Sequence, residues 1–397
     1  MKKVVLAYSG GLDTSFCAKY LSVEKKMEVY SVIVNTGGFD TDELVEIEEK
    51  AYELGAKDHK TIDITGEYYT KCIKYLIFGN ILKNNTYPLS VSSERTFQAI
   101  AIAEYAKEIG AEYIAHGSTG AGNDQVRFDY VFNILVPEIN IITPIRELSL
   151  SRDQEIDYLK KSGVIDNWAT KSYSINKGLW GTSIGGKETL TSNKSLPEEA
   201  YTNKFIDQEE KEIILGFEKG EIHSLNGTVL KDKVNLIKRI DEIASSYAIG
   251  RDMHIGDTIL GTKGRVAFEA AAPMLIIKAH HALEKHTLTK WQLHWKEQLA
   301  NWYGMFLHES QYLEPVMRNI EKFLVDSQKS VNGEVILKLA PYRFSVVGIN
   351  SPNDLMQSDV CEYGEVNKAW KADDVKGFTK ILANSLSIYS NVNKMEY

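Results

Sequence analysis

The chain has 397 residues, which is long enough for two or three domains with hydrophobic cores of their own. Apolar residues make up 43% of it and charged residues 25%, as is usual for a soluble globular protein. The net charge of −8 argues against nucleic acid or an anionic membrane surface as a partner. No window of about 18 apolar residues is present, so no membrane span is predicted.

The start of the chain and its cysteines predict a cytoplasmic protein. The first predicted strand begins within four residues of the N-terminus, which leaves no room for a signal or transit peptide. The cysteines are odd in number and far apart: Cys17, Cys72 and Cys361. This excludes a CxxC pair and suits a reducing compartment.

The first predicted element is a strand over residues 4–8, which are apolar at every position, as in a strand buried on both faces. Ser9-Gly10-Gly11-Leu12-Asp13-Thr14-Ser15 follows it and leads into a predicted helix. Free N–H groups and the dipole of a helix N-terminus favour an anion, and glycine allows its close approach. The stretch is either a phosphate cradle or an ordinary strand–helix connection. It is neither a Walker A loop nor a Rossmann fingerprint, because both spacings are absent.

The rest of the first 165 residues alternates between strand-like and helix-like stretches. Strands are expected over residues 29–34, 61–64, 111–115 and 139–145, and helices over residues 43–54, 67–82 and 93–109. A capping box over residues 151–154 opens one more helix. This alternation predicts a doubly wound parallel α/β sheet, which binds ligands at the carboxyl ends of its strands.

The regular alternation of strand-like and helix-like stretches ends after Trp168. Residues 171–205 read as a long loop, helices are expected over residues 233–247 and 288–326, and Asn226-Gly227 and Asn332-Gly333 each predict a hairpin. We therefore predict a nucleotide-binding domain (residues 1–165), an α+β domain (166–365) and a C-terminal helix (366–397). One face of that helix is apolar, and we expect it to dock on its own subunit or on another; it carries Phe378, Ile381, Leu382, Leu386 and Tyr389.

A second motif, His116-Gly117-Ser118-Thr119-Gly120-Ala121-Gly122-Asn123-Asp124-Gln125-Val126-Arg127-Phe128, follows a predicted strand. Its glycines again allow a ligand to approach the backbone. Asn123 and Asp124 offer donors and acceptors for an amino acid, and Arg127 offers a bidentate partner for a carboxylate. The alternative is a glycine-rich surface loop with a solvated ion pair.

Together the two motifs resemble those of the argininosuccinate synthases, within the N-type ATP pyrophosphatase superfamily. The block from His116 to Phe128 is the more specific match, and a weaker likeness extends over nearly the whole chain. The resemblance implies that ATP activates the ureido oxygen of citrulline as a citrullyl-AMP intermediate, and that aspartate then displaces AMP to give argininosuccinate and pyrophosphate. It also implies a homotetramer whose terminal helix reaches a neighbour.

The resemblance further implies the residues that act. Catalytic roles fall to Ser9, Asp13 and Asp124. The ATP contacts are Ala7, Tyr8, Ser9, Gly10, Gly11, Leu12, Asp13, Thr14, Ser15, Val34 and Gly117. The aspartate contacts are Thr119, Asn123 and Asp124. The citrulline contacts are Tyr87, Ser92, Asn123, Arg127, Ser174 and Ser183. Mg²⁺ should bridge the pyrophosphate oxygens; its protein ligands are not identified, and Asp13 and Asp124 are the candidates.

The sequence departs from the family around the citrulline site. Asn176-Lys177-Gly178 stands where the family has Asp-Glu-Asn, Gly256 stands where it has a citrulline-binding Glu, and Phe268 replaces a Tyr. A site with fewer acids suits a ureido substrate whose α-nitrogen is uncharged, such as N-acetylcitrulline or N-succinylcitrulline. Alternatively, Asp252 or Asp257 replaces the missing Glu and ordinary citrulline binds.

Functions from three other classes are the alternatives to a synthase. A sulfur-transferring tRNA-modifying enzyme needs paired cysteines and a basic surface, and both are missing. A glutamine-dependent amidating enzyme needs a glutaminase nucleophile, whereas Cys17 lies inside the first predicted helix. A ligand sensor without enzymatic activity stays open as the third alternative.

Overall fold

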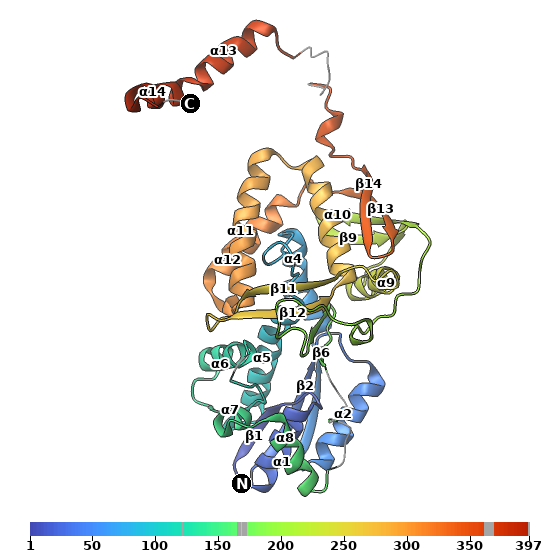
Figure 1. The fold of residues 1–397 in the computed structure, drawn as a ribbon, viewed down its shortest axis with the longest axis vertical. Coiled ribbons are helices and arrows are strands. Elements are labelled where there is room, and N and C mark those ends of the chain that lie inside the picture. The colour runs from blue at the N-terminus through green and yellow to red at the C-terminus, as the bar shows by residue number, and fades with distance from the viewer. Residues whose placement is uncertain (121, 165–167, 169–172, 361–368, 396–397) are drawn as a thin grey trace.

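A five-stranded parallel sheet forms the core of the N-terminal region in the computed structural model, which describes residues 1–120, 122–164, 168, 173–360 and 369–395 (Figure 1). The strand order is β3-β2-β1-β4-β5, so β1 is central. The strands are β1 (Lys3–Ala7), β2 (Glu28–Asn35), β3 (Asp58–Asp63), β4 (Tyr113–Ala115) and β5 (Asn140–Ile142).

Helices cover both faces of this sheet, which confirms the doubly wound prediction. Val4 and Leu6 of β1 pack in one core with side chains of α1 (Leu12–Val23), α2 (Thr41–Glu53) and α8 (Arg152–Lys161). Val5 points to the opposite face and joins the core that contains α5 (Ser90–Glu108) and α6 (Asp124–Leu135). Successive strand residues face opposite sides, so a strand covered on both faces must be apolar throughout.

Several helices and strands begin or end at other residues than predicted. The strand expected at residues 61–64 is the longer β3, and the strand expected at 139–145 ends early because Pro144 begins the short helix α7 (Pro144–Leu148). The helix expected over residues 67–82 runs instead as α3 (Thr65–Tyr68), a π-helical segment (Tyr69–Ile73) and α4 (Lys74–Phe78). Helix α6 was not predicted.

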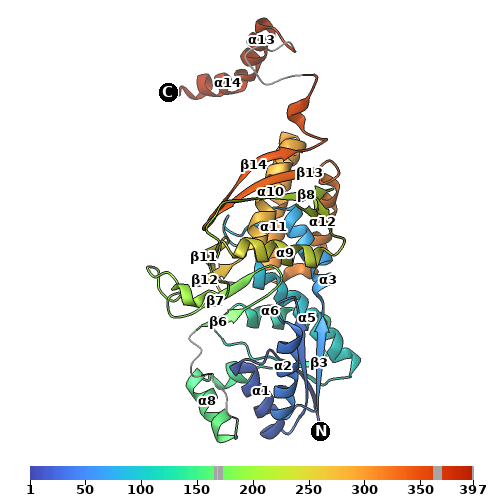
Figure 2. The same ribbon diagram turned by 90° about the vertical axis from the view of Figure 1, so that its right-hand side faces the viewer.

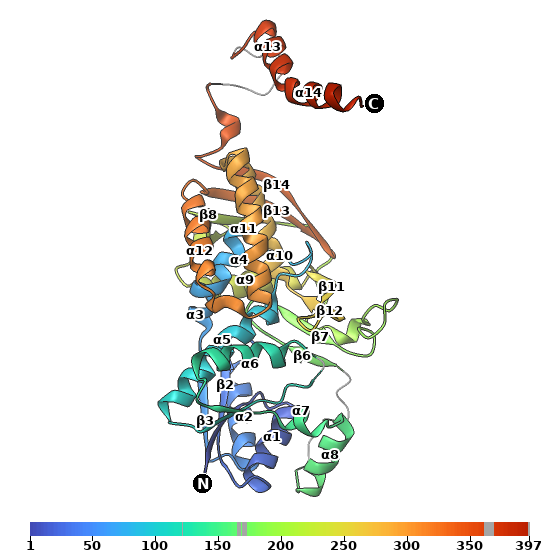
Figure 3. The same cartoon turned by 90° about the vertical axis from the view of Figure 1, so that its left-hand side faces the viewer.

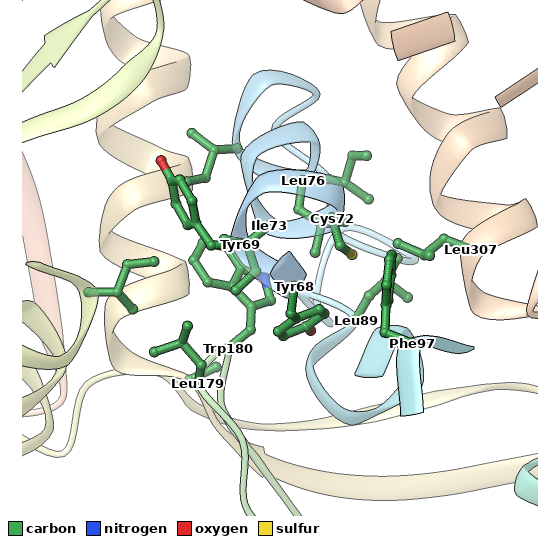
Figure 4. Packing of buried hydrophobic residues seen from close by; sticks show 14 of the residues in the cluster. Tyr68, Tyr69, Cys72, Ile73, Leu76, Leu89, Phe97, Leu179, Trp180 and Leu307 are labelled. Carbon is green, nitrogen blue, oxygen red and sulfur yellow. The ribbon is translucent and has the colours of Figure 1, made fainter. Parts of the chain in front are cut away.

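The segment Thr65–Phe78 leaves the first sheet and packs into the C-terminal half. Figure 4 shows Tyr68, Tyr69 and Cys72 in a core that also receives Trp180 and Leu307 from distant parts of the chain. Tyr69 is tied to that half by a hydrogen bond from its hydroxyl to Glu221. The apolar residues of the segment Thr65–Phe78 therefore pack at the contact between the two halves of the molecule.

A second, antiparallel sheet builds the far end of the molecule, in the order β10-β9-β8-β13-β14. The helices packed around it include α10, and α11 and α12 lie together (Figure 3). The elements are β8 (Lys211–Glu218), β9 (Glu221–Leu225), β10 (Thr228–Val229), α9 (Lys233–Ser245), α10 (Ala271–Thr287), α11 (Lys290–His308), α12 (Pro315–Ser327), β13 (Gly333–Ala340) and β14 (Arg343–Asn350).

One of the two predicted hairpins is confirmed and the other is wrong. Asn226-Gly227 joins the antiparallel strands β9 and β10. Asn332-Gly333 instead lies between α12 and β13, where the Asn332 side chain accepts a hydrogen bond from the Lys219 backbone N–H. The true hairpin joins β13 to β14 further along the chain. An Asn-Gly pair also suits a helix-to-strand turn, so the dipeptide alone does not separate the two uses.

The helical stretch expected over residues 288–326 is divided between two helices, α11 and α12. It breaks between α11 and α12, where Ser310 adopts a left-handed conformation (φ 62°) and Pro315 begins the next helix. Ser310 is fully buried and its hydroxyl lies 2.9 Å from that of Thr96, so tertiary contacts support the break.

A four-stranded antiparallel sheet lies between the two ends of the molecule, in the order β11-β12-β7-β6 (Figure 2). It combines β11 (Arg251–Asp257) and β12 (Lys263–Glu269), which were not predicted, with β6 (Ser174–Asn176) and β7 (Thr182–Gly185). The expected loop over residues 171–205 therefore contains two strands in its described part. Residues 171 and 172 of that loop lie outside the described residues.

The C-terminal segment forms α13 (Ala372–Leu382) and α14 (Asn384–Asn393), separated at Ala383, where one helix was expected within residues 366–397 (Figure 1). Its predicted apolar face is exposed: Phe378, Ile381, Leu382, Leu386 and Tyr389 are each more than half accessible. Among the described helices, none is long and apolar enough to cross a membrane.

Candidate functional site

The loop after β1 forms a tight turn that ends in the first turn of α1. Gly10 adopts a left-handed conformation (φ 72°), and Gly11 begins the helix without a capping side chain. Ser9 and Thr14 close the turn, because the Ser9 N–H donates to Thr14 Oγ1 (3.3 Å). Without a capping side chain, the N–H groups of this helix end are available to an anion. Ser15 is fully buried beneath the loop.

The second motif lies directly against this loop. Gly117 follows β4, and a Cβ built on it would be 3.2 Å from both Asp13 Cβ and the Thr14 backbone nitrogen. Because β1 and β4 are parallel neighbours, their carboxyl ends meet at the same edge of the sheet. The two loops that the sequence analysis singled out therefore form one site.

Asp13 is paired with a buried acid that the sequence analysis missed. Glu155 of α8 is 3% exposed and shares a hydrogen bond with the Asp13 carboxyl group. Burial, reinforced by the charge of Asp13, raises the pKa of Glu155 to about 8. Burial also raises the pKa of Asp13, while the Glu155 hydrogen bond and Arg152 oppose that rise. Glu155 therefore carries the proton at neutral pH, and Asp13 is the anion.

Side chains from α6 and α7 hold the second loop in place. Gln125 donates to the Gly120 backbone oxygen (2.6 Å) and accepts from Arg146. His116 Nε2 lies 2.9 Å from Asp129, whose second oxygen pairs with Arg146 at 2.8 Å. Ala121, within this loop, lies outside the described residues.

Asp124 is held by two arginines. Its Oδ2 accepts from Arg95 Nε (3.0 Å) and its Oδ1 accepts from Arg127 (2.9 Å). Desolvation opposes ionisation, but the two guanidinium groups outweigh it and lower the pKa of Asp124 to about 2. Asp124 is therefore a permanent anion whose two oxygens are both engaged. The other two guanidinium nitrogens of Arg127 contact His308: Nε donates to its backbone oxygen, and Nη2 lies within hydrogen-bond distance of its ring Nδ1.

Arg95, which the sequence analysis did not assign, connects three parts of the site. Besides Asp124, it donates to Gln98 (2.8 Å) and to Asn176 Oδ1 on β6 (2.8 Å). Gln98 in turn donates to the Val34 backbone oxygen at the end of β2 (3.3 Å). Position in sequence gave no signal for this role, because Arg95 lies inside a helix far from both motifs.

The register of the four-stranded sheet brings two of the six predicted citrulline contacts, Ser174 and Ser183, together with positions where the sequence departs from the family. Asp252, Phe268, Ser183 and Asn176 lie opposite one another on neighbouring strands and therefore share one face, here called the Ser183 face. Ser174 belongs to the same face, two residues before Asn176 on β6, and is exposed.

Tyr87 packs onto the Ser183 face. Its hydroxyl lies 3.3 Å from Ser183 Oγ, and its ring contacts Phe268 and stacks on His254. The other predicted contacts lie apart from this pair. Ser92 is buried, with its hydroxyl bonded to the Leu89 backbone, and Thr119 is exposed. Asn123 accepts from the Ile259 N–H in the β11–β12 loop (2.8 Å).

The two acids proposed to replace the missing Glu differ in direction. Gly256 lies on the Ser183 face, and a Cβ there would be 2.8 Å from the His254 ring. Asp257 is the next residue and so points to the other face, where it pairs with Lys263 (2.6 Å). Asp252 is on the Ser183 face but is exposed and accepts from the Met253 N–H.

Comparison with known families supports the likeness drawn from the motifs. A model described as "Arginosuccinate synthase N-terminal HUP domain" matches residues 3–165, and one described as "Arginosuccinate synthase C-terminal domain" matches residues 173–389. Among similar curated proteins, the argininosuccinate synthase of Methanocaldococcus jannaschii is 39% identical, over 91% of both chains. Those of Dictyoglomus turgidum (37%, 98% of both chains) and Pyrococcus furiosus (38%, 96% of this chain and 92% of the relative) are similarly close.

Proposed function

Because the chain belongs to the argininosuccinate synthase family, we propose that it uses ATP to join citrulline to aspartate, giving argininosuccinate, AMP and pyrophosphate in arginine biosynthesis. The observation that carries this proposal is the contact of Gly117 with the first turn of α1. It brings a loop suited to phosphate against the loop that leads to Asn123, Asp124 and Arg127.

Two substitutions at carbon and phosphorus make up the reaction. The ureido oxygen of citrulline attacks the α-phosphorus of ATP and pyrophosphate leaves. The amine of aspartate then attacks the activated ureido carbon and gives up a proton, and the carbon–oxygen bond breaks, so that AMP leaves with the former ureido oxygen. No covalent bond to the protein is needed, so the chain contributes positioning and charge stabilisation.

The charged and polar residues of the site suit different parts of the reaction. The N-terminus of α1, with Ser9 and Thr14, suits the leaving pyrophosphate. Arg127 is the cation for a substrate carboxylate, and Asp124 holds it in place. Arg95 positions Asp124 and Asn176 together, and the Tyr87–Ser183 pair supplies hydroxyl groups for the ureido substrate.

Magnesium fits the site as a partner of ATP. Among the described residues, no three His, Cys, Asp or Glu side chains form a cluster that could hold a metal ion. A magnesium ion bound with ATP would be held mainly by phosphate oxygens and one or two carboxylates, and it would neutralise phosphate charge. We propose the Asp13 carboxylate for that contact rather than Asp124, because both oxygens of Asp124 bond to arginines.

Product analysis tests the function. We expect release of pyrophosphate from ATP only when aspartate and a ureido acid are both present, with argininosuccinate detected by mass spectrometry. Pyrophosphate release that does not depend on both substrates, or none under any combination, would overturn the proposal and return the ligand sensor as the alternative.

A second candidate substrate, an N-acylated citrulline, is favoured by the scarcity of acids on the Ser183 face. Asp257 points away from it, and Asp252 is exposed at the edge strand. A free α-ammonium group would therefore lack charge-assisted hydrogen bonds, which contribute roughly 1.5–3 kcal/mol each. Lys177, an exposed residue directly after Asn176 at the end of β6, is the cation that would suit the extra carboxylate of N-succinylcitrulline.

Competition between substrates decides this point. The measurement compares kcat/KM for citrulline, N-acetylcitrulline and N-succinylcitrulline at fixed ATP and aspartate. A preference for citrulline of tenfold or more, about 1.4 kcal/mol in transition-state binding, would remove the acylated substrate. Assembly as a homotetramer and location in the cytoplasm both stay predictions.

A further inference from the structure

Two backbone segments cross where the first sheet meets β6 and β7. Residues 36–38 follow β2, residues 177–179 follow β6, and the Leu179 N–H donates to the Thr36 oxygen (3.0 Å). A Cβ on Gly38 would be 2.1 Å from the Lys177 oxygen, so the two backbones touch without an intervening side chain. This crossing is one of the places where the nucleotide half of the site contacts the strands of the Ser183 face.

Glu94, a buried acid of α5, bridges the crossing. Its Oε2 accepts from the Thr36 hydroxyl (3.0 Å), and its Oε1 fills the space beside Gly178, where a Cβ would be 1.5 Å away. The side chain is 1% exposed, and within the described part of the chain Oε1 has no hydrogen-bond partner. One carboxyl group therefore contacts both segments.

The surroundings of Glu94 favour its neutral form at pH 7. Burial raises its pKa to about 8, against the opposing effects of Arg95 on the same helix and of the Thr36 hydroxyl. Asp124 of α6 reinforces the rise, and Tyr68 and Cys72 are the titratable groups that face it from the Thr65–Phe78 segment. A carboxylate with an unpartnered buried oxygen is unfavourable, so ionisation would displace the group or its neighbours.

The crossing lies between β6 and β7, two of the four strands of the Ser183 face. Asn176, one residue before the crossing, bonds to Arg95, and Ser183 lies four residues after it. Between them, Leu179 and Trp180 anchor the segment in the core (Figure 4). A shift of residues 177–179 would therefore move Asn176 and Ser183 relative to the phosphate loop.

We propose that Glu94 is a positioning residue whose neutral carboxyl group holds residues 177–179 against residues 36–38 and so aligns the Ser183 face with the nucleotide loop. Ionisation of Glu94 loosens the crossing. The assignment rests on the proposed function only for its effect on turnover; the packing itself is measured independently.

The first experiment follows pH in Glu94→Gln, which keeps the shape and the neutral charge. We expect kcat/KM of the wild type for its ureido substrate to fall up to tenfold per pH unit above about pH 8, and that of the variant to stay level. Hydrogen exchange of peptides within residues 173–185, corrected for intrinsic rates, should accelerate over the same range only in the wild type. Glu104→Gln, an exposed glutamate of the same helix, is the matched control and should behave as wild type.

The same alkaline fall and the same exchange in Glu94→Gln would overturn the proposal. Absence of turnover by the wild type with every ureido acid would overturn the proposed function instead, and the exchange measurement would still decide the role of Glu94.

A second experiment does not depend on pH. Gly178 does not have a left-handed backbone, and the three atoms nearest to a Cβ built there all belong to the Glu94 carboxyl group. We expect Gly178→Ala to lower kcat/KM at least tenfold. The double variant Gly178→Ala/Glu94→Ala should have a kcat/KM at least threefold higher than that of Gly178→Ala alone. A silent Gly178→Ala, or two losses that simply multiply, would contradict the proposed contact.

Discussion

At the scale of single residues, three acids near the carboxyl edge of the first sheet differ in charge: one is ionised and two are neutral at pH 7. Two guanidinium groups hold Asp124 as an anion with a pKa of about 2, whereas burial raises the pKa of Glu94 and Glu155 to about 8. These acids look alike in the sequence. Their charge depends on which cations and how much solvent the fold leaves beside them.

Asp13 is predicted to act through its charge at the phosphate loop. Asp13→Ala and Ser9→Ala should each remove roughly 2–4 kcal/mol of transition-state stabilisation, judged by the value of a preorganised donor, while the fold survives. Steady-state kcat/KM for ATP measures the loss, and circular dichroism checks the fold. Asp42→Ala, which removes an exposed acid from the first turn of α2, is the matched control. Normal turnover in either loop variant would place the phosphate contacts elsewhere.

Glu155 is predicted to make stability depend on pH. Its raised pKa means that the folded protein keeps a proton which the unfolded chain has already lost, so the free energy of unfolding falls as pH rises from about 5 to 8. Glu155→Gln should therefore gain stability relative to wild type over that range. Urea denaturation at pH 5 and pH 8 in magnesium-free buffer measures this, with the exposed Asp153→Asn of the same helix turn as control. An equal slope in both proteins would mean that Glu155 does not titrate there.

At the scale of elements, a buried polar network joins three helices. Lys296 of α11 is fully buried and donates to Glu284 of α10 and to the Phe78 backbone oxygen at the end of α4, each at 2.8 Å. Glu284 also accepts from Gln328 and Asn80. The network holds the Thr65–Phe78 segment in the C-terminal half.

Removal of the cation from this network should be strongly destabilising. We expect Lys296→Met to lower the free energy of unfolding by about 3–5 kcal/mol, because Glu284 stays buried without its counter-charge. Lys290→Met, an exposed position of the same helix, should change it by less than about 0.5 kcal/mol. Chemical denaturation compares the two variants, and similar effects would show that the network contributes little.

At the scale of the whole molecule, the helices α13 and α14 carry an apolar face whose side chains are exposed in the described part of the chain. We predict that deletion of residues 372–397 lowers the oligomeric state measured by light scattering, since this face needs a surface to cover it. Ile381→Asp should act in the same direction, whereas Lys380→Asp, the adjacent position, should not. An unchanged mass after deletion would mean that the segment docks on its own subunit.

The sequence by itself determined the local features of this protein. The unbroken apolar run of β1, the glycines at its end and the helix that follows predict a buried strand and a phosphate loop, because each depends only on neighbouring residues. The same holds for the capping box of α8, which the structure confirms with Gln154 bonded to Ser151. The motif from His116 to Phe128 was enough to indicate the family.

Tertiary structure alone decided which distant residues meet. Glu155 reaches Asp13 across more than a hundred residues, Arg95 joins three elements, and strand register places Ser183 opposite Phe268. It also decided that Asn332-Gly333 ends a helix connection and that residues 65–78 cross into the other half. Local patterns record propensity and periodicity, whereas these contacts depend on loop closure, register and burial, which the chain acquires only once its elements pack.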